Sequence, residues 1–178
     1  MRKLLQRSAG IMAVNVLMWV SLGTAPRLAA QDARFADAPR ALVLQAGQWY
    51  EDVNGMIVAS IRAELPLAGN GHWLIVPGVT YAHFTYEDTP VPEVDLLAPE
   101  VLVHLQLGQG WLRPYVGGGA GIVLVNMFHK VDPVLSLGAG MRADLTPRLS
   151  ARIEVDTRMF GQFNAGSVGW SVGLARRF

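Results

Sequence analysis

The chain has 178 residues, of which 51% are hydrophobic and 16% are charged, against about 25% charged residues in an ordinary soluble domain. This length allows one folded domain. The absence of cysteine excludes a disulfide framework and a thiolate metal site, and a formal net charge of +1 without a clustered basic face argues against a nucleic-acid partner.

The amino-terminal 30 residues have the pattern of a secretory signal peptide. A basic start, "MRKLLQR", precedes the uncharged run "IMAVNVLMWVSL" and the small-residue stretch "GTAPRLAAQ". This apolar run is too short for a membrane-spanning helix, which needs about 20 residues. We predict that residues 1–30 are a signal peptide cleaved after Ala30, rather than an uncleaved anchor or a buried helix. Cleavage removes four of the 15 basic residues and no acidic one, so the mature chain has 11 basic and 14 acidic residues, a net charge of −3.

The mature chain begins with a polar, alanine-rich stretch, residues 31–40, which we interpret as a flexible periplasmic lead-in. The remainder, residues 41–178, divides into segments of strand-like sequence separated by turn signals. Most of these segments are longer than the five or six residues usual in soluble sheets and long enough to cross a bilayer as tilted strands. The eight expected strands are residues 41–49, 56–67, 72–84, 96–107, 111–125, 133–145, 148–160 and 167–178.

The connections between these segments alternate in length. Short ones (68–71, 108–110 and 146–148) alternate with longer ones (50–55, 85–95, 126–132 and 161–166). Short periplasmic turns and longer external loops are typical of transmembrane β-barrels. The sequence therefore predicts an all-β fold, an eight-stranded antiparallel up-and-down transmembrane β-barrel over residues 41–178, with both ends of the chain in the periplasm.

The period-two pattern of the strands predicts which face meets lipid. In "RLSARIEVDTRMF", residues 148–160, apolar residues such as Ile153 and Val155 alternate with Arg152, Glu154 and Asp156. With the apolar face toward lipid, the charges point into the lumen, which side chains fill in a barrel of this size. Buried charges must pair, and inward glycines leave room for long side chains, so we expect a polar plug and no open pore. The predicted lumen network consists of Arg62, Glu64, Glu100, His104, Arg113, Tyr115, Arg142, Asp144, Arg152, Glu154, Asp156 and Arg158.

Aromatic residues lie near the ends of the expected strands. We expect them at the membrane interface, where a ring can be buried while its polar edge stays wet. The alternative is that some of them are core residues. They are Trp49, Tyr50, Trp73, Tyr81, Phe84, Tyr86, Trp111, Phe128, Phe160, Trp170 and Phe178.

Two stretches, "WLRPYVGGGAGI" and the closing "GWSVGLARRF", resemble the small outer-membrane β-barrel proteins of Gram-negative bacteria, the group that includes the OmpA barrel domain, OmpX and the opacity proteins. In that group a fifth strand often reads "RPY" before a glycine-rich run, and the chain usually ends on phenylalanine after alternating apolar residues. The resemblance implies a monomeric barrel in outer-membrane lipid and a carboxy-terminal signal for the barrel-assembly machinery. The matching residues are Trp170, Val172, Leu174 and Phe178, while Arg176 departs from the pattern by placing a charge on the lipid face.

Some barrels of this group are lipid A-modifying enzymes, and the deacylase type resembles a serine hydrolase with a His-x-Ser pair and an acid on the outer wall. Here no histidine has a serine two positions later, although His83 is followed by Thr85. Glu100 and His104 share a strand face, but four residues separate them by roughly 13 Å, which is too far for a dyad. His72 and His129 are isolated, so the sequence favours no metal site. We expect a protein without catalytic activity or cofactors.

One other reading remains open from the residues alone. A secreted soluble barrel of the lipocalin type would have the same alternation with the faces reversed, and would bind a small apolar ligand inside. The glycine-rich inward positions and the terminal phenylalanine pattern favour the membrane barrel, with a structural or surface-interaction role. The longest expected external loop of this barrel, residues 85–95, is acidic and contains proline. The sequence does not identify a binding partner for it.

Overall fold

The computed structural model describes residues 40–51, 54–67, 72–84, 94–108, 110–125, 130–161 and 165–178. The predicted signal peptide, residues 1–30, and residues 31–39 of the predicted lead-in lie outside the described residues. The same holds for most of the predicted external loops.

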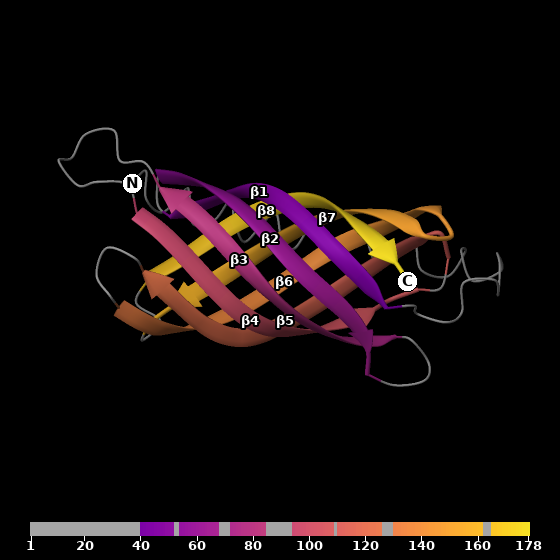
Figure 1. Ribbon diagram of the computed structural model, residues 1–178, viewed down its shortest axis with the longest axis horizontal. Coiled ribbons are helices and arrows are strands. Elements are labelled where there is room, and N and C mark those ends of the chain that lie inside the picture. The colour runs from indigo at the N-terminus through magenta and orange to yellow at the C-terminus, as the bar shows by residue number, and fades with distance from the viewer. Residues whose placement is uncertain are drawn as a thin grey trace, which may run out of the picture.

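Eight antiparallel strands form one closed barrel, in which each strand pairs with the next and β1 pairs with β8. The strands wrap obliquely around a common axis (Figure 1). The predicted fold is therefore confirmed. The strands are β1 (Ala41–Glu51), β2 (Asn54–Pro66), β3 (Trp73–Phe84), β4 (Val94–Gln106), β5 (Leu112–Val125), β6 (Lys130–Thr146), β7 (Leu149–Phe160) and β8 (Ala165–Arg177).

The strand ends differ from the predicted ones by at most three residues, and the largest difference is at the start of β6. Residues 130–132 were expected in an external loop, but they continue the ladder with β5, where Lys130 pairs with Val125 and Asp132 with Val123. Asp95 was also expected in a loop and instead pairs with His83 in the ladder between β3 and β4. Backbone pairing with a neighbour extends these strands past the residues whose polarity suggested a turn.

Both ends of the barrel segment lie at one end of the barrel, which we call the terminus end. Ala41 pairs with Arg177, and the C-terminus is at the right of Figure 1, where β8 ends. The turn between β6 and β7 is at the same end, and its Arg148 and Leu149 N–H groups donate hydrogen bonds to Thr146 Oγ1 (3.2 and 3.0 Å). The opposite end, where β1 leads into β2, is called the loop end.

The barrel is apolar outside and charged inside. The outward side chains of Ile57 and Leu174 are 68% and 52% exposed, whereas the inward side chains of Arg142 and Arg158 are each 1% exposed. Among the described residues, no helix is long and apolar enough to cross a membrane. This distribution is the reverse of a soluble barrel's, and it matches the predicted orientation of the two faces.

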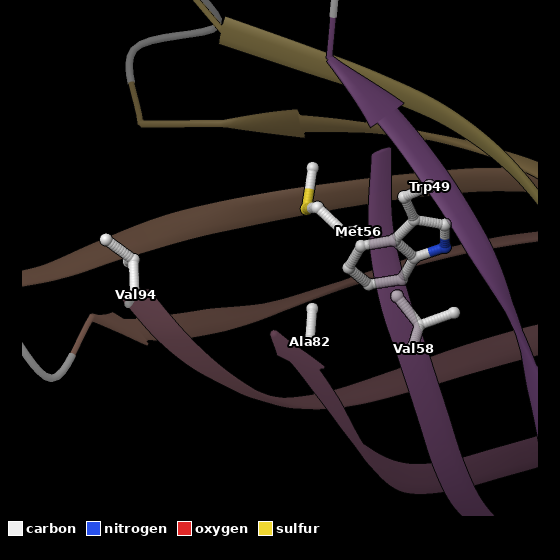
Figure 2. Close-up of a cluster of buried hydrophobic side chains, with 5 residues drawn as sticks. All are labelled: Trp49, Met56, Val58, Ala82 and Val94. Carbon is white, nitrogen blue, oxygen red and sulfur yellow. The ribbon is translucent and has the colours of Figure 1, made fainter. Parts of the chain in front are cut away.

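An apolar cluster closes the lumen near the loop end, and we call it the apolar cap. Figure 2 shows its five buried members, which come from β1 to β4. They are Trp49, Met56, Val58, Ala82 and Val94, and Leu96, Val125 and Phe160 pack against them.

The apolar cap corrects the prediction for two aromatic residues. Trp49 is 3% exposed and faces the lumen, and the ring centroid of Phe160 lies 6.5 Å from that of Trp49. Both were expected at the lipid interface because they are near strand ends. Near the loop end the inward positions of these strands are also apolar, so polarity no longer distinguishes the two faces there.

Candidate functional site in the barrel lumen

The candidate functional site is the charged lumen between the apolar cap and the terminus end. The structure buries the side chains of all twelve predicted network residues there. They come from β2, β4, β5, β6 and β7, the strands whose inward positions alternate with lipid-facing residues. They fall into two groups, one around Glu100 in the middle of the barrel and one around Glu64 and Asp144 toward the terminus end.

Glu100 on β4 is the centre of the middle group. Arg158 on β7 donates to both of its oxygens, from Nη1 to Oε2 (2.8 Å) and from Nη2 to Oε1 (3.0 Å). Thr80 and Ser136 each donate a hydroxyl hydrogen bond to the same carboxylate at 3.0 Å, and Arg62 Nη2 lies 3.4 Å from Oε1. A paired Arg–carboxylate contact with further donors is the arrangement that offsets the cost of burying both charges.

Two further carboxylates of β7 complete the middle group. Glu154 accepts hydrogen bonds from Arg62 Nη1 (2.8 Å) and from the Tyr115 hydroxyl (2.7 Å). Asp156 accepts one from Arg158 Nε (2.8 Å). Arg158 also stacks over the ring of Trp49, with its Cζ atom 4.1 Å from the centroid. This cation–π contact joins the charged network to the apolar cap.

The second group, toward the terminus end, has a different charge balance. Glu64 accepts a hydrogen bond from Arg142 Nη1 (3.0 Å), and Arg152 Nη1 lies 2.7 Å from its other oxygen. Asp144 contacts three guanidinium groups. They belong to Arg113 (Nη2, 3.1 Å), Arg142 (Nε, 3.3 Å) and Arg177.

His104 and Tyr115 lie between the two groups. Their rings stack with centroids 4.9 Å apart and an interplanar angle of 24°. The guanidinium of Arg152 covers the Tyr115 ring at 4.5 Å, and its Nη2 is 3.5 Å from His104 Nδ1. The structure thus places His104 against Tyr115 and Arg152 and gives it no dyad with Glu100.

Inward glycines make room for these side chains. A Cβ atom on Gly140 would lie 2.4 Å from the Tyr115 ring, and one on Gly117 would lie 2.3 Å from His104. A cavity of about 10 Å³ remains beside His104, Tyr115 and Asp156, which is about the space one water molecule needs. The lumen of the described barrel is therefore filled by side chains, as in other barrels of this size.

Several polar residues of the lumen were not in the predicted network. Arg177 binds Asp144, while Thr80 and Ser136 bind Glu100, and Arg142 Nε donates to Ser150 Oγ (3.1 Å). The period-two pattern places Arg177 on the inward face of β8, and this signal was available in the sequence. The same pattern places Ser136 and Ser150 on the inward faces of β6 and β7, so the signal was available for these hydroxyl groups as well.

A polar cluster also lies on the outer wall near the loop end. His83 Nδ1 is 2.9 Å from Asp95 Oδ1, and the Tyr81 hydroxyl donates to the same oxygen. The sequence analysis found no serine two positions after His83 and so no hydrolase pair. The ladder between β3 and β4 nevertheless places an acid, Asp95, beside His83, which the spacing along the chain did not reveal. Thr85 lies outside the described residues. No group of three or more His, Asp or Glu side chains suited to a metal ion occurs in the described part of the chain.

The predicted assembly-signal residues occupy the outer wall and the end of β8. Trp170, Val172 and Leu174 alternate outward along the strand, and Phe178 is 77% exposed. The Phe178 N–H donates to the Arg40 carbonyl oxygen (3.0 Å), which holds the chain end beside the start of β1. A role as an assembly signal stays a prediction.

No family model and no curated protein matches this sequence. Among solved structures, neisserial surface protein A matches with a TM-score of 0.55 at 12% identity, over 78% of this chain and 96% of that one. The outer-membrane enzyme PagL matches with a TM-score of 0.55 at 10% identity, over 78% and 99%. The amino-terminal barrel domain of Pseudomonas aeruginosa OprF matches with a TM-score of 0.51 at 16% identity, over 78% and 97%.

These similarities show the fold. The chain is a closed eight-stranded antiparallel barrel like those of small outer-membrane proteins, which agrees with the resemblance found in the sequence. The neighbours include an enzyme, so the shared architecture does not distinguish catalytic from non-catalytic barrels.

Proposed function

We propose that this protein is an integral outer-membrane β-barrel with a structural or surface-interaction role, monomeric and without catalytic activity. The observation that carries the proposal is the inside-out distribution of its side chains. Apolar residues cover the outer wall, and paired charges fill the lumen. A lipid environment stabilises such a wall, whereas water would not.

The same observation argues against the lipocalin-like alternative. A soluble ligand-binding barrel would need an apolar cavity inside and polar residues outside. Instead, Arg158 and Glu100 occupy the middle of the lumen and side chains pack around them. An apolar ligand would have to displace a buried ion pair, which is costly.

Secretion and assembly follow from the two ends of the sequence. Residues 1–30 would direct export and be removed, and the outward-facing Trp170, Val172, Leu174 and Phe178 would be read by the assembly machinery. The acidic connection between β3 and β4, residues 85–93, would be at the cell surface, since these two strands are joined at the end opposite the termini. A surface role would depend on this end of the barrel.

Fractionation tests the proposal directly. We expect the protein in the outer-membrane fraction, with an electrophoretic mobility that changes on boiling because a folded barrel is compact in detergent. Recovery as soluble periplasmic protein, with the same mobility before and after boiling, would overturn the proposal. The search would then turn to a ligand inside a soluble barrel.

One observation favours a second candidate, an enzyme acting on the lipid of the outer leaflet. The contact between Asp95 and His83 Nδ1 orients a ring nitrogen on the outer wall, as an acid does for a general base. The pair lies near the loop end, at the level where lipid head groups would be.

Mass spectrometry of lipopolysaccharide incubated with the purified barrel separates the two candidates. The non-catalytic proposal expects unchanged lipid from the native chain. Loss of an acyl chain with the native protein, but not with His83→Ala, would instead establish the enzyme. His72→Ala is the control, because His72 bonds the Gln106 carbonyl at the terminus end.

A further inference from the structure

Three exposed arginines lie together at the terminus end of the barrel, and we call them the arginine patch. They are Arg40 just before β1, Arg148 in the turn between β6 and β7, and Arg176 near the end of β8. The Arg40 carbonyl oxygen accepts a hydrogen bond from the Phe178 N–H (3.0 Å), and the Arg148 carbonyl oxygen accepts one from the Arg177 N–H (2.9 Å). The end of β8, which carries Arg176, thus lies between the other two.

Arg176 occupies the row of side chains that faces lipid. It continues the outward alternation of Val172 and Leu174, which are 48% and 52% exposed. Across the two ladders it lies opposite Leu42 on β1 and Leu149 on β7. From such a position an arginine can reach the head groups while its methylene groups stay against apolar neighbours. The patch is therefore at the edge of the apolar wall.

Most other outward side chains at the terminus end are apolar in the part of the chain that the structure describes. Leu67, Trp73, Trp111 and Leu145 are all exposed there, on other sides of the barrel. Tryptophan prefers the boundary between lipid and water, so this end lies at the level of the head groups of one leaflet. The patch concentrates positive charge at one place on that boundary.

No described carboxylate neutralises the patch. The three guanidinium groups form no ion pair or hydrogen bond with the described chain. The carboxylates at this end, Glu64 and Asp144, are inside the lumen and contact other arginines. Even a terminal carboxylate on Phe178 would leave the three arginines in excess. Like charges held side by side repel each other, so the patch favours an anionic partner from outside the chain.

We propose that the arginine patch binds the head group of an anionic phospholipid in the leaflet at the terminus end, an inference that rests on the proposed function as an outer-membrane barrel. Guanidinium groups bind phosphate oxygens through paired N–H donors. The apolar side chains beside the patch, Leu174 and Phe178, are 52% and 77% exposed and contact the acyl chains of the same lipid. A free phosphate ion would satisfy only the charged part of this surface.

The loop end has the opposite charge balance. At the rim of that end the described strands carry three carboxylates, on Glu51, Asp95 and Asp132, and one lysine, Lys130. An anionic head group is repelled by such a rim. Binding of anionic phospholipid is therefore a property of the terminus end alone.

The test measures which lipid the folded barrel retains. The protein is folded in a zwitterionic detergent with phosphatidylglycerol or phosphatidylcholine at equal concentration, and native mass spectrometry counts the bound lipids. The boiling-dependent mobility shift establishes that the barrel is folded. We expect phosphatidylglycerol to bind at least about fivefold more tightly, the factor that one basic side chain contributes near an anionic surface. High salt should reduce this preference.

Single substitutions locate the binding site. Arg176→Gln should weaken phosphatidylglycerol binding about fivefold, whereas Arg176→Lys keeps the charge and should retain most of the affinity. Lys130→Gln is the matched control, because it removes one positive charge at the opposite end of the barrel, and it should bind like the native chain. Arg148→Gln, in an exposed turn, tests the same patch if Arg176→Gln does not fold.

Equal affinity of the native chain for the two lipids, or an equal loss in Lys130→Gln, would contradict the proposal and leave the barrel itself unaffected. Displacement of phosphatidylglycerol by inorganic phosphate would also contradict it, because the patch would then bind the ion and not the lipid. A chain that is soluble without detergent and shows no mobility shift would refute the proposed function, and this inference with it.

Discussion

Among single residues, the buried carboxylates differ in the number of hydrogen-bond donors that each one binds. Glu100 takes a two-point contact from Arg158, hydroxyl bonds from Thr80 and Ser136, and a longer contact from Arg62. No other carboxylate of the described lumen combines a two-point guanidinium contact with two hydroxyl donors in this way. Its charge therefore holds side chains of five strands in one arrangement.

Removing that charge should be costly. We expect Glu100→Gln to destabilise the folded barrel by about 3–5 kcal/mol, because Arg158 would become a buried charge without a full partner. Urea unfolding from lipid vesicles, followed by tryptophan fluorescence, measures the change. Asp95→Asn makes the same chemical change at a half-exposed pair on the outer wall and should leave the unfolding midpoint nearly unchanged. Equal effects of the two variants would mean that the lumen network contributes little.

Within each strand, inward and outward side chains alternate with a period of two residues, and the outward face is the one toward lipid. On β7, the inward Arg152, Glu154 and Asp156 are buried, while Ile153 between them is 51% exposed on the outer wall. The ladders to β6 and β8 keep this alternation, because Ile153 pairs with Met141 on one side and with Val172 on the other. Three outward apolar residues thus meet at one level of the wall.

A charge on this face should be penalised according to its depth. We expect Ile153→Lys to destabilise the barrel in vesicles by about 2–4 kcal/mol, since a cation near the middle of the lipid wall is poorly solvated. Leu145 faces outward near the end of β6, beside the turn at the terminus end. Leu145→Lys should lower the stability of the barrel by no more than about 1 kcal/mol. The same unfolding experiment compares them. If both variants were equally stable, the apolar wall would not be in lipid.

In the molecule as a whole, two layers of side chains close the lumen. The apolar cap closes it near the loop end, and the charged network fills it from the middle to the terminus end. The stacking of Arg158 on Trp49 connects the two layers. A barrel of this size has no room for both this packing and an aqueous path.

A closed lumen predicts the absence of channel activity. Purified protein inserted in a planar bilayer should give no stepwise conductance at moderate voltage. Insertion itself is checked by the boiling-dependent mobility shift of protein recovered from the same lipid. Reproducible single-channel steps from inserted protein would show that the network opens, and would replace the structural role with a pore.

The number of strands, their approximate ends and the face that each strand turns inward were predictable from the amino-acid sequence, because side chains alternate along a strand with a period of two whatever its neighbours are. The sequence therefore predicted which charged residues enter the lumen, from Arg62 on β2 to Arg158 on β7. It did not determine which charges meet. The pairing of Arg158 with Glu100, or of Arg142 with Glu64, links residues 58 and 78 positions apart, and it depends on the stagger of strands around the closed barrel.

Three further features depend on how the strands are placed around the closed barrel. Trp49 and Phe160 turned out to cap the lumen, because near the loop end both faces of the strands are apolar and the pattern loses its contrast. Asp95 meets His83 through the register of β3 against β4, which no local spacing reveals. Asp144 meets Arg113, Arg142 and Arg177 at the terminus end because β5, β6 and β8 bring these side chains together there, and no single strand shows this grouping.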